Sequence, residues 1–170
     1  SLHASELIHH DLAVTLHPSE HRLTATDTIT VPGEQAEIRF VLHRGLTPSS
    51  SDPRVQIAKE KDQPGPVPLE SFIVTLPAGV RTFRVRYAGA IYHPVEHAGK
   101  EQARGFDQTA GTISEDGVYL SGSSVWYPQF GQGLMTFTLK VELPAGWDAV
   151  SEGSRLGREK EKRLVRVRWD

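Results

Sequence analysis

The stretch Leu134–Leu143 reads LMTFTLKVEL. From Phe137 to Leu143 its apolar residues occupy every second position, and threonine, lysine and glutamate stand between them. Strict alternation of this kind is typical of a β-strand with one buried and one solvated face. A Pro-Ala-Gly turn follows directly at residues 144–146, which would end the strand. This stretch therefore predicts a strand, and the same alternation recurs along most of the chain.

Two alternating runs near the N-terminus, residues 8–16 and 23–31, flank the segment His17–His21 and predict an antiparallel pair joined by a turn. Further runs of this kind cover residues 36–43, 72–76, 83–87, 149–152 and 165–169, with a short edge strand expected around 55–57. No window favours an amphipathic helix. We therefore predict an all-β fold, an antiparallel β-sandwich or open barrel of about eight to ten strands with long polar loops.

The amino-acid composition excludes several kinds of functional site. The chain has 170 residues, which suits one domain, and it has no cysteine, which excludes disulfides, thiolate zinc sites and a cysteine nucleophile. Its net charge is −2 with both signs interspersed, so nothing favours nucleic acid. No apolar run approaches the ~20 residues of a membrane span. Because the chain starts at Ser1 without methionine and stops after a strand-like run, we expect an excised domain followed by another; the compartment is not indicated.

Several histidines are candidate metal ligands. His17–His21 matches the inverted zincin pattern H-x-x-E-H, but that chemistry needs both histidines on one helical face. A segment between two alternating runs predicts an exposed turn instead. Residues 9–11 read His-His-Asp, and consecutive side chains of a strand point to opposite faces. His93, Glu96 and His97 lie in a long polar loop, where a metal is an alternative to ordinary surface positions.

The segment Gly117–Gly133 reads GVYLSGSSVWYPQFGQG and joins that loop to the clearest strand. Its serines, at 121–124, lack the strand-to-helix setting of a nucleophile elbow. Proline and glycine make the segment a bend that presents aromatic and amide side chains, chiefly Trp126, Tyr127 and Gln129. Two interpretations stay open: the aromatic residues fill the core, or one or two of them line a pocket.

At these residues the chain resembles the N-terminal domain of the gluzincin zinc aminopeptidases, the alanyl aminopeptidase family. His10–Val31 is similar to the family's first hairpin, and Gly117–Gly122 to its entry into the aromatic stretch. Phe137–Gly153, FTLKVELPAGWDAVSEG, is similar to its strand, Pro-x-Gly turn and return. The strand ending at Trp169 resembles the one that precedes the catalytic domain.

The resemblance implies that residues 1–170 form a single N-terminal β-sandwich, or saddle, that is not itself catalytic. In that family a thermolysin-like domain follows and holds zinc through H-E-x-x-H, with G-x-M-E-N for the substrate's amino terminus. Neither motif occurs in this chain, so zinc is expected beyond residue 170. The expected partners are that domain and a peptide substrate. By order and spacing Gln129 is the match to the family's cleft-facing glutamine, with Tyr127 and Trp126 bordering the pocket.

Two other functions compete with this one. Trp126, Tyr127 and Trp147 could form a flat aromatic platform that binds a carbohydrate or another ligand. Alternatively, the chain is a purely structural spacer between domains, in which case none of these side chains contacts a substrate.

Overall fold

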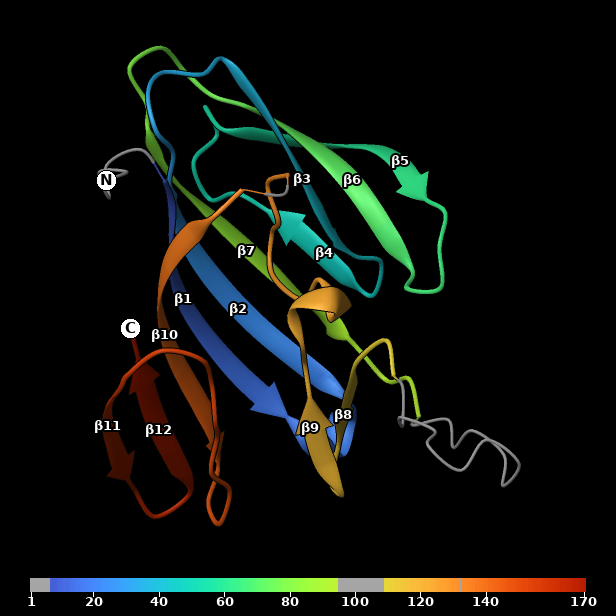
Figure 1. The fold of residues 1–170 in the computed structure, drawn as a ribbon, viewed down its shortest axis with the longest axis vertical. Coiled ribbons are helices and arrows are strands. Elements are labelled where there is room, and N and C mark those ends of the chain that lie inside the picture. The colour runs from blue at the N-terminus through green and yellow to red at the C-terminus, as the bar shows by residue number, and fades with distance from the viewer. Residues whose placement is uncertain (1–6, 95–108, 132) are drawn as a thin grey trace.

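Strands dominate the parts of the chain that the computed structural model describes, residues 7–94, 109–131 and 133–170 (Figure 1). In chain order they are β1 Ile8–His17, β2 Arg22–Thr30, β3 Glu37–His43, β4 Leu46–Ser49, β5 Gln56–Gln63, β6 Leu69–Thr75, β7 Thr82–Ala90, β8 Thr112–Ser114, β9 Gly117–Tyr119, β10 Met135–Pro144, β11 Arg155–Lys160 and β12 Leu164–Trp169. Two 3-10 turns, η2 Pro18–Glu20 and η3 Gly122–Ser124, are the helical elements of the described residues. The all-β class is confirmed, with more strands than expected.

Seven strands form the main sheet in the order β11-β12-β10-β1-β2-β7-β4. The predicted hairpin is confirmed, because β1 and β2 pair antiparallel from His9–Thr30 to His17–Arg22. One pairing differs from the expected antiparallel pattern: β1 and β10 run parallel, from Ile8 opposite Met135 to Thr15 opposite Glu142. Parallel neighbours need a long connection, and here most of the chain lies between the two strands.

A second, three-stranded antiparallel sheet has the order β3-β6-β5 and lies across from the main sheet in Figure 1. The edge strand expected near residue 57 is confirmed as β5, which is longer than the sequence indicated. A small hairpin of β8 and β9 completes the described sheets. Strand β8 lies within the long polar loop that the sequence predicts before Gly117; residues 95–108 of that loop are outside the described residues.

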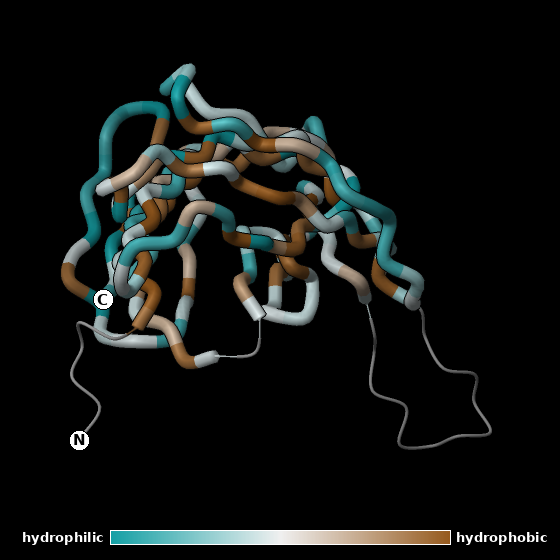
Figure 2. Tube along the Cα trace, turned by 90° about the horizontal axis from the view of Figure 1, so that it is seen from above, coloured by the Kyte–Doolittle hydropathy of each residue, from teal (hydrophilic) through white to brown (hydrophobic). Residues whose placement is uncertain are grey.

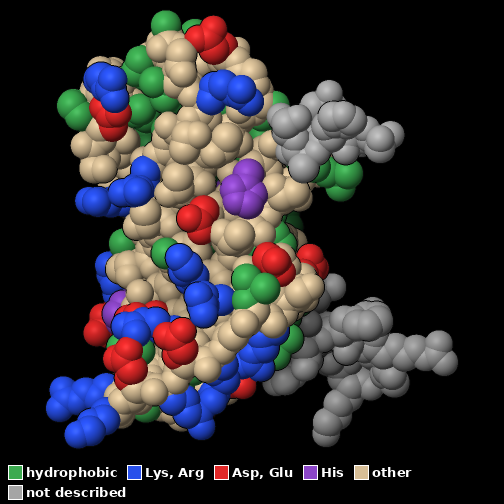
Figure 3. Space-filling view, turned by 90° about the vertical axis from the view of Figure 1, so that its left-hand side faces the viewer, with side chains coloured by type: hydrophobic (Ala, Val, Ile, Leu, Met, Phe, Trp, Pro, Cys, Tyr) green, Lys and Arg blue, Asp and Glu red, His purple; other side chains and the backbone are tan. Residues whose placement is uncertain are grey.

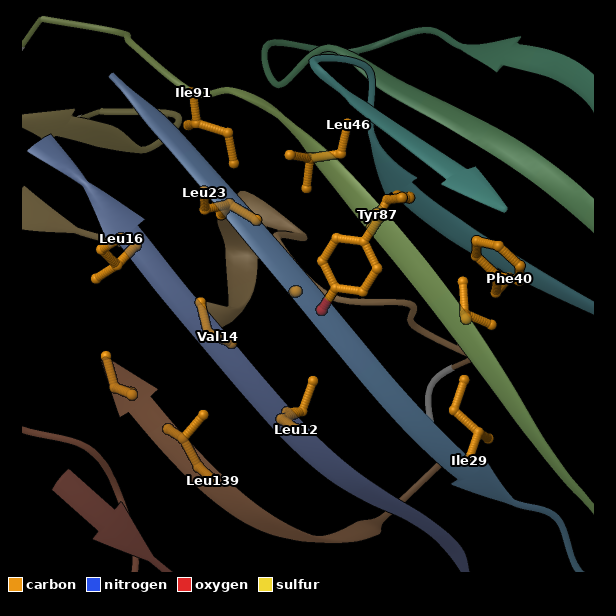
Figure 4. Close-up of a cluster of buried hydrophobic side chains, with 14 of the residues drawn as sticks. Leu12, Val14, Leu16, Leu23, Ile29, Phe40, Leu46, Tyr87, Ile91 and Leu139 are labelled. Carbon is orange, nitrogen blue, oxygen red and sulfur yellow. The ribbon is translucent and has the colours of Figure 1, made fainter. Parts of the chain in front are cut away.

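The alternation in the sequence places the core between these layers. Figure 4 shows Leu12, Val14 and Leu16 of β1 on the same side as Leu23 and Ile29 of β2, facing the core. Each is at most 7% exposed, and full burial of such a side chain contributes about 1.5–3 kcal/mol. Figure 2 shows the corresponding alternation of apolar and polar residues along the strands.

One expected strand is wrong. The return strand after the Pro-Ala-Gly turn does not lie at residues 149–152 but starts at Arg155. Asp148 explains the shift, because its Oδ1 accepts the backbone N–H of Ala149 at 2.9 Å and an Arg155 N–H at 2.7 Å. Local side-chain bonds of this kind compete with strand pairing, so the chain remains irregular until β11 begins at Arg155.

Candidate functional site

The aromatic segment crosses from the small hairpin to β10 beside β3. After η3, Val125 adopts a left-handed conformation (φ 52°) and turns the chain. The backbone of Gln129 then pairs with Val41 of β3, with N–H···O distances of 2.9 and 3.0 Å. The expected bend is therefore confirmed, and two backbone hydrogen bonds fix its position against the second sheet.

The three residues singled out from the sequence lie together in this bend, and all three are half-buried. The rings of Trp126 and Tyr127 meet edge to face at 5.2 Å and 78°. The Nε2 of Gln129 donates to the carbonyl oxygen of Gly122 at 2.7 Å. Burial raises the pKa of Tyr127, and a hydrogen bond from the Gln129 amide lowers it by less. Because the two rings are nearly perpendicular, they do not form a flat platform.

The aromatic side chains of this segment contact the core and also line a hollow at the surface. Trp126 and Tyr127 pack against the core cluster, yet each keeps part of its surface exposed. Tyr127 and Gln129 also line a hollow of about 490 Å³ at the end of the main sheet where β1 and β10 begin. Ile8, Leu134 and His10 are among the other lining residues. Aromatic side chains here therefore serve both the core and a surface hollow.

A buried histidine–aspartate pair lies behind Tyr127. His10 Nδ1 and Asp27 Oδ2 are 2.7 Å apart, and the side chains are 1% and 0% exposed. The ring of His10 meets Tyr127 edge to face at 5.7 Å and lies 5.8 Å from Phe130. Burial raises the pKa of Asp27, while the hydrogen bond and charge of His10 act in the opposite direction and Asp11 adds to the increase. His10 also lines the hollow.

Sequence reasoning missed this pair, although the signal was present. On β2 the inward positions are every second residue, and position 27 falls between Ala25 and Ile29 on that face. His10 likewise occupies an inward position of β1 and pairs with Ile29. An aspartate at an inward position of a central strand needs a partner. Only the register of β1 against β2 identifies that partner as His10.

The prediction that consecutive side chains at residues 9–11 point to opposite faces of the strand is confirmed. His9 and Asp11 point to the outer face, opposite to His10, where their side chains bond Thr136 at 2.8 Å and Thr138 at 2.6 Å. The three side chains therefore do not converge on one metal.

The H-x-x-E-H segment forms a turn, as predicted. Its middle residues make up η2, and His21 follows in a left-handed conformation (φ 57°). The Nδ1 of His21 lies 2.7 Å from the carbonyl oxygen of Ile113, and its ring stacks on Tyr92 at 3.9 Å. The helical geometry that the zincin motif requires is absent from this described segment.

A histidine pair that the sequence did not indicate joins β3 to the chain after β7. The Nε2 atoms of His43 and His93 are 2.9 Å apart, and His43 is 2% exposed. The sequence groups His93 with Glu96 and His97 in one loop, but the latter two residues lie outside the described residues. Within the described ranges, no three His, Asp or Glu side chains are grouped as a metal site would require.

A larger hollow, of about 650 Å³, lies on the outer face of the main sheet. Threonines form part of its lining, with Lys140, Glu142, Arg166 and Arg168. Figure 3 shows lysine and arginine side chains gathered at the lower end of the molecule, where β11 and β12 lie in Figure 1. Arg166 pairs with Glu142 at 2.9 Å and Arg168 with Glu159 at 3.3 Å. These charges are thus partly compensated across neighbouring strands.

Comparisons of sequence identify no relative: no family model and no curated protein matches the chain. Comparison of structures is informative. The M1 zinc metallopeptidase from Deinococcus radiodurans superposes with a TM-score of 0.55 at 23% identity, over 96% of this chain and 38% of that one. A mutant of that enzyme, solved with a Tyr-Ser-Ala substrate, gives a TM-score of 0.55 at 22% identity over the same shares.

Yeast LTA4 hydrolase superposes with a TM-score of 0.53 at 14% identity, over 96% of this chain and 26% of its own. In the described residues no helix has the length and apolar character needed to cross a membrane. The chain spans about a quarter of the length of yeast LTA4 hydrolase and about two fifths of the length of the Deinococcus radiodurans metallopeptidase. Its architecture, from β1 to β12, is therefore the fold of one part of the M1 zinc metallopeptidases.

Proposed function

We propose that residues 1–170 are the non-catalytic N-terminal β-domain of a zinc-dependent aminopeptidase-like protein. In this proposal the domain packs against a catalytic domain of the same polypeptide and borders the cleft for its peptide substrate. The observation that supports it most is the structural match over 96% of this chain and only 38% of an M1 zinc metallopeptidase. The zinc would supply the hydrolytic chemistry, and it would belong to the other domain.

The hollow beside Gln129 is the part of this domain that we place at the cleft. Gln129 is held by its own backbone pairing and by its bond to Gly122, so its amide has a fixed orientation. A neutral amide can hydrogen-bond an ammonium or a carbonyl group without the cost of burying a charge. Tyr127 and Trp126 would form the border of the pocket.

The test of this function is made on the polypeptide that contains this chain. Its zinc content and its release of an aminoacyl reporter are measured together, and the segment after residue 170 is examined for H-E-x-x-H. Bound zinc with reporter cleavage supports the proposal. A protein that binds no zinc and releases no reporter contradicts the enzymatic part of it.

Replacing Gln129 by alanine tests the role of the hollow. We expect kcat/KM for the aminoacyl reporter to fall by the equivalent of about 1–3 kcal/mol, because a hydrogen bond to the bound peptide is lost. Gln56→Ala, at an exposed position of β5, is the matched control and should leave kcat/KM unchanged. Equal kinetics for both variants would favour the structural spacer. Thermal unfolding of Gln129→Ala shows whether the lost bond to Gly122 also loosens the bend.

A further inference from the structure

We propose that the larger hollow, on the outer face of the main sheet, binds a small hydroxylated molecule through its phosphate monoester group, which Arg86 and Lys140 contact from opposite sides. Strands β7, β2, β1 and β10 form the floor of this hollow and lie side by side in Figure 1. Its lining residues lie on described strands, and none of them also lines the hollow beside Gln129. The proposal depends on neither zinc nor a catalytic domain.

The register of the strands places two cations on opposite sides of a floor of smaller side chains. Arg86 of β7 is opposite Thr26 of β2, and Thr26 is opposite Ala13 of β1. Ala13 is in turn opposite Lys140 of β10. Adjacent strands are about 4.8 Å apart, so three spacings separate the Cα atoms of Arg86 and Lys140 by about 14 Å. Both long side chains are exposed and line the hollow, so their charged ends can contact one anion above the floor.

The charges of the hollow are unbalanced. Four lining side chains are cationic and two are anionic, which gives a net charge of +2, although the chain as a whole has a net charge of −2. The two glutamates, Glu142 and Glu159, are both opposite Arg166, and Glu142 pairs with it at 2.9 Å. A phosphate monoester carries a charge of about −1.5 to −2 at pH 7. It therefore matches the excess charge of the hollow better than a carboxylate or a sulfate ester, which carries a single charge.

The register also brings two like charges together. Lys140 is directly opposite Arg168 of β12, and like charges in this position destabilise a strand pair. Arg168 contacts Glu159 at 3.3 Å, but this pair is exposed and contributes little. Among the acidic side chains of the described residues, none forms an ion pair with Lys140 or Arg86. An anion bound beside Lys140 therefore relieves a repulsion within the folded chain.

The rest of the floor indicates what the phosphate is attached to. Hydroxyl groups can donate or accept hydrogen bonds, and five of them line the hollow, from Thr15, Thr24, Thr26, Thr47 and Ser49. Among the described lining residues only Tyr87 is aromatic, and it is 2% exposed, so it presents no face on which a nucleobase would stack. The volume of about 650 Å³ lies in the range of about 300–1,000 Å³ that is typical of ligand pockets. These features favour a sugar phosphate or another polyol phosphate over a nucleotide.

Calorimetry on the polypeptide that contains this chain measures the binding of glucose 6-phosphate, with inorganic phosphate, glucose and glucose 6-sulfate for comparison. We expect glucose 6-phosphate to bind most tightly of the four, and more weakly as the salt concentration rises. Replacing Arg86 or Lys140 by alanine should raise its dissociation constant about tenfold, because a charge-assisted hydrogen bond is lost. Arg84→Ala removes an exposed cation of β7 that does not line the hollow. It is the matched control and should leave the dissociation constant nearly unchanged.

Two variants separate lost binding from lost stability. Ala13→Glu places a carboxylate on the exposed floor, opposite Lys140, and should abolish binding of glucose 6-phosphate while the core stays as it is. Lys140→Ala removes the like-charged neighbour of Arg168, so its thermal midpoint should stay the same or rise although its binding weakens.

Four results would overturn the proposal. These are the absence of glucose 6-phosphate binding to the unsubstituted protein, equal weakening by Arg84→Ala and Arg86→Ala, unchanged binding by Ala13→Glu, and binding of inorganic phosphate or glucose 6-sulfate as tight as that of glucose 6-phosphate. A lower thermal midpoint for Lys140→Ala would contradict the repulsion on which the site depends. Zinc content and reporter cleavage decide the proposed function and have no bearing on this site.

Discussion

Replacing Asp27 by alanine should lower the free energy of unfolding by about 3–5 kcal/mol, the typical cost of removing one partner of a buried ion pair. The reason is that His10 stays in place, 1% exposed and surrounded by Tyr127 and Phe130, while its Nδ1 loses the oxygen that it contacts at 2.7 Å. Urea unfolding followed by circular dichroism at pH 7 measures the change.

Two further variants separate the lost contact from the altered size of the side chain. Asp27→Asn retains an oxygen that can accept the Nδ1 hydrogen, so its cost should be nearer to about 1 kcal/mol. In the double variant His10→Leu with Asp27→Leu neither member of the pair is left buried without its partner, and stability should recover most of the loss. A cost below about 1 kcal/mol for Asp27→Ala would show that water reaches the pair in the native state.

Local alternation was sufficient to predict most of the fold. It identified β1, β2, β7 and β10 because each of these strands has one face on the core and one in water. It could not predict that β1 and β10 are parallel neighbours, since that pairing joins residues such as Ile8 and Met135 that are far apart in the chain. The irregular run before β11 depends on the side chain of Asp148, which a binary pattern does not describe.

The candidate site, too, could be predicted only in part from the sequence. Trp126, Tyr127 and Gln129 come together because they are close neighbours on one bend. The proline and glycines of that segment allowed the bend to be predicted. The pair of His10 and Asp27 could be recognised only from the register of two strands, β1 and β2. A polar residue at an inward strand position should therefore be read as half of a buried pair whose partner lies on a neighbouring strand.

Acidification should destabilise the protein through His43. Its pKa is lowered to about 4, first by burial and then by the charges of His93 and Arg44. The geometry agrees, because Nδ1 accepts the backbone N–H of Gly45 at 2.9 Å. In the neutral ring the proton is then on Nε2, which donates to His93 at 2.9 Å. A second proton on His43 would face the N–H of Gly45 and break this arrangement.

The sign follows from comparing the two states. Above the ordinary histidine pKa of 6.5 neither state of His43 holds an extra proton, and its contribution to stability is complete. Between 6.5 and about 4 the unfolded chain takes up a proton that the native ring does not, so stability falls by about 1.4 kcal/mol per pH unit. The total loss attributable to this residue is about 3 kcal/mol, and it levels off below about pH 4.

The contribution of His43 is obtained as the difference between two unfolding curves across this pH range. His43→Asn keeps an acceptor for Gly45 but cannot titrate, so the gap in stability between the unsubstituted protein and this variant should shrink by about 3 kcal/mol from pH 7 to pH 4. Asp27, whose raised pKa acts in the opposite direction, is common to both proteins and cancels. His17→Asn, at the end of β1, controls for the loss of an imidazole elsewhere. A gap that stays constant with pH would mean that the native ring of His43 accepts a proton as readily as the unfolded chain does.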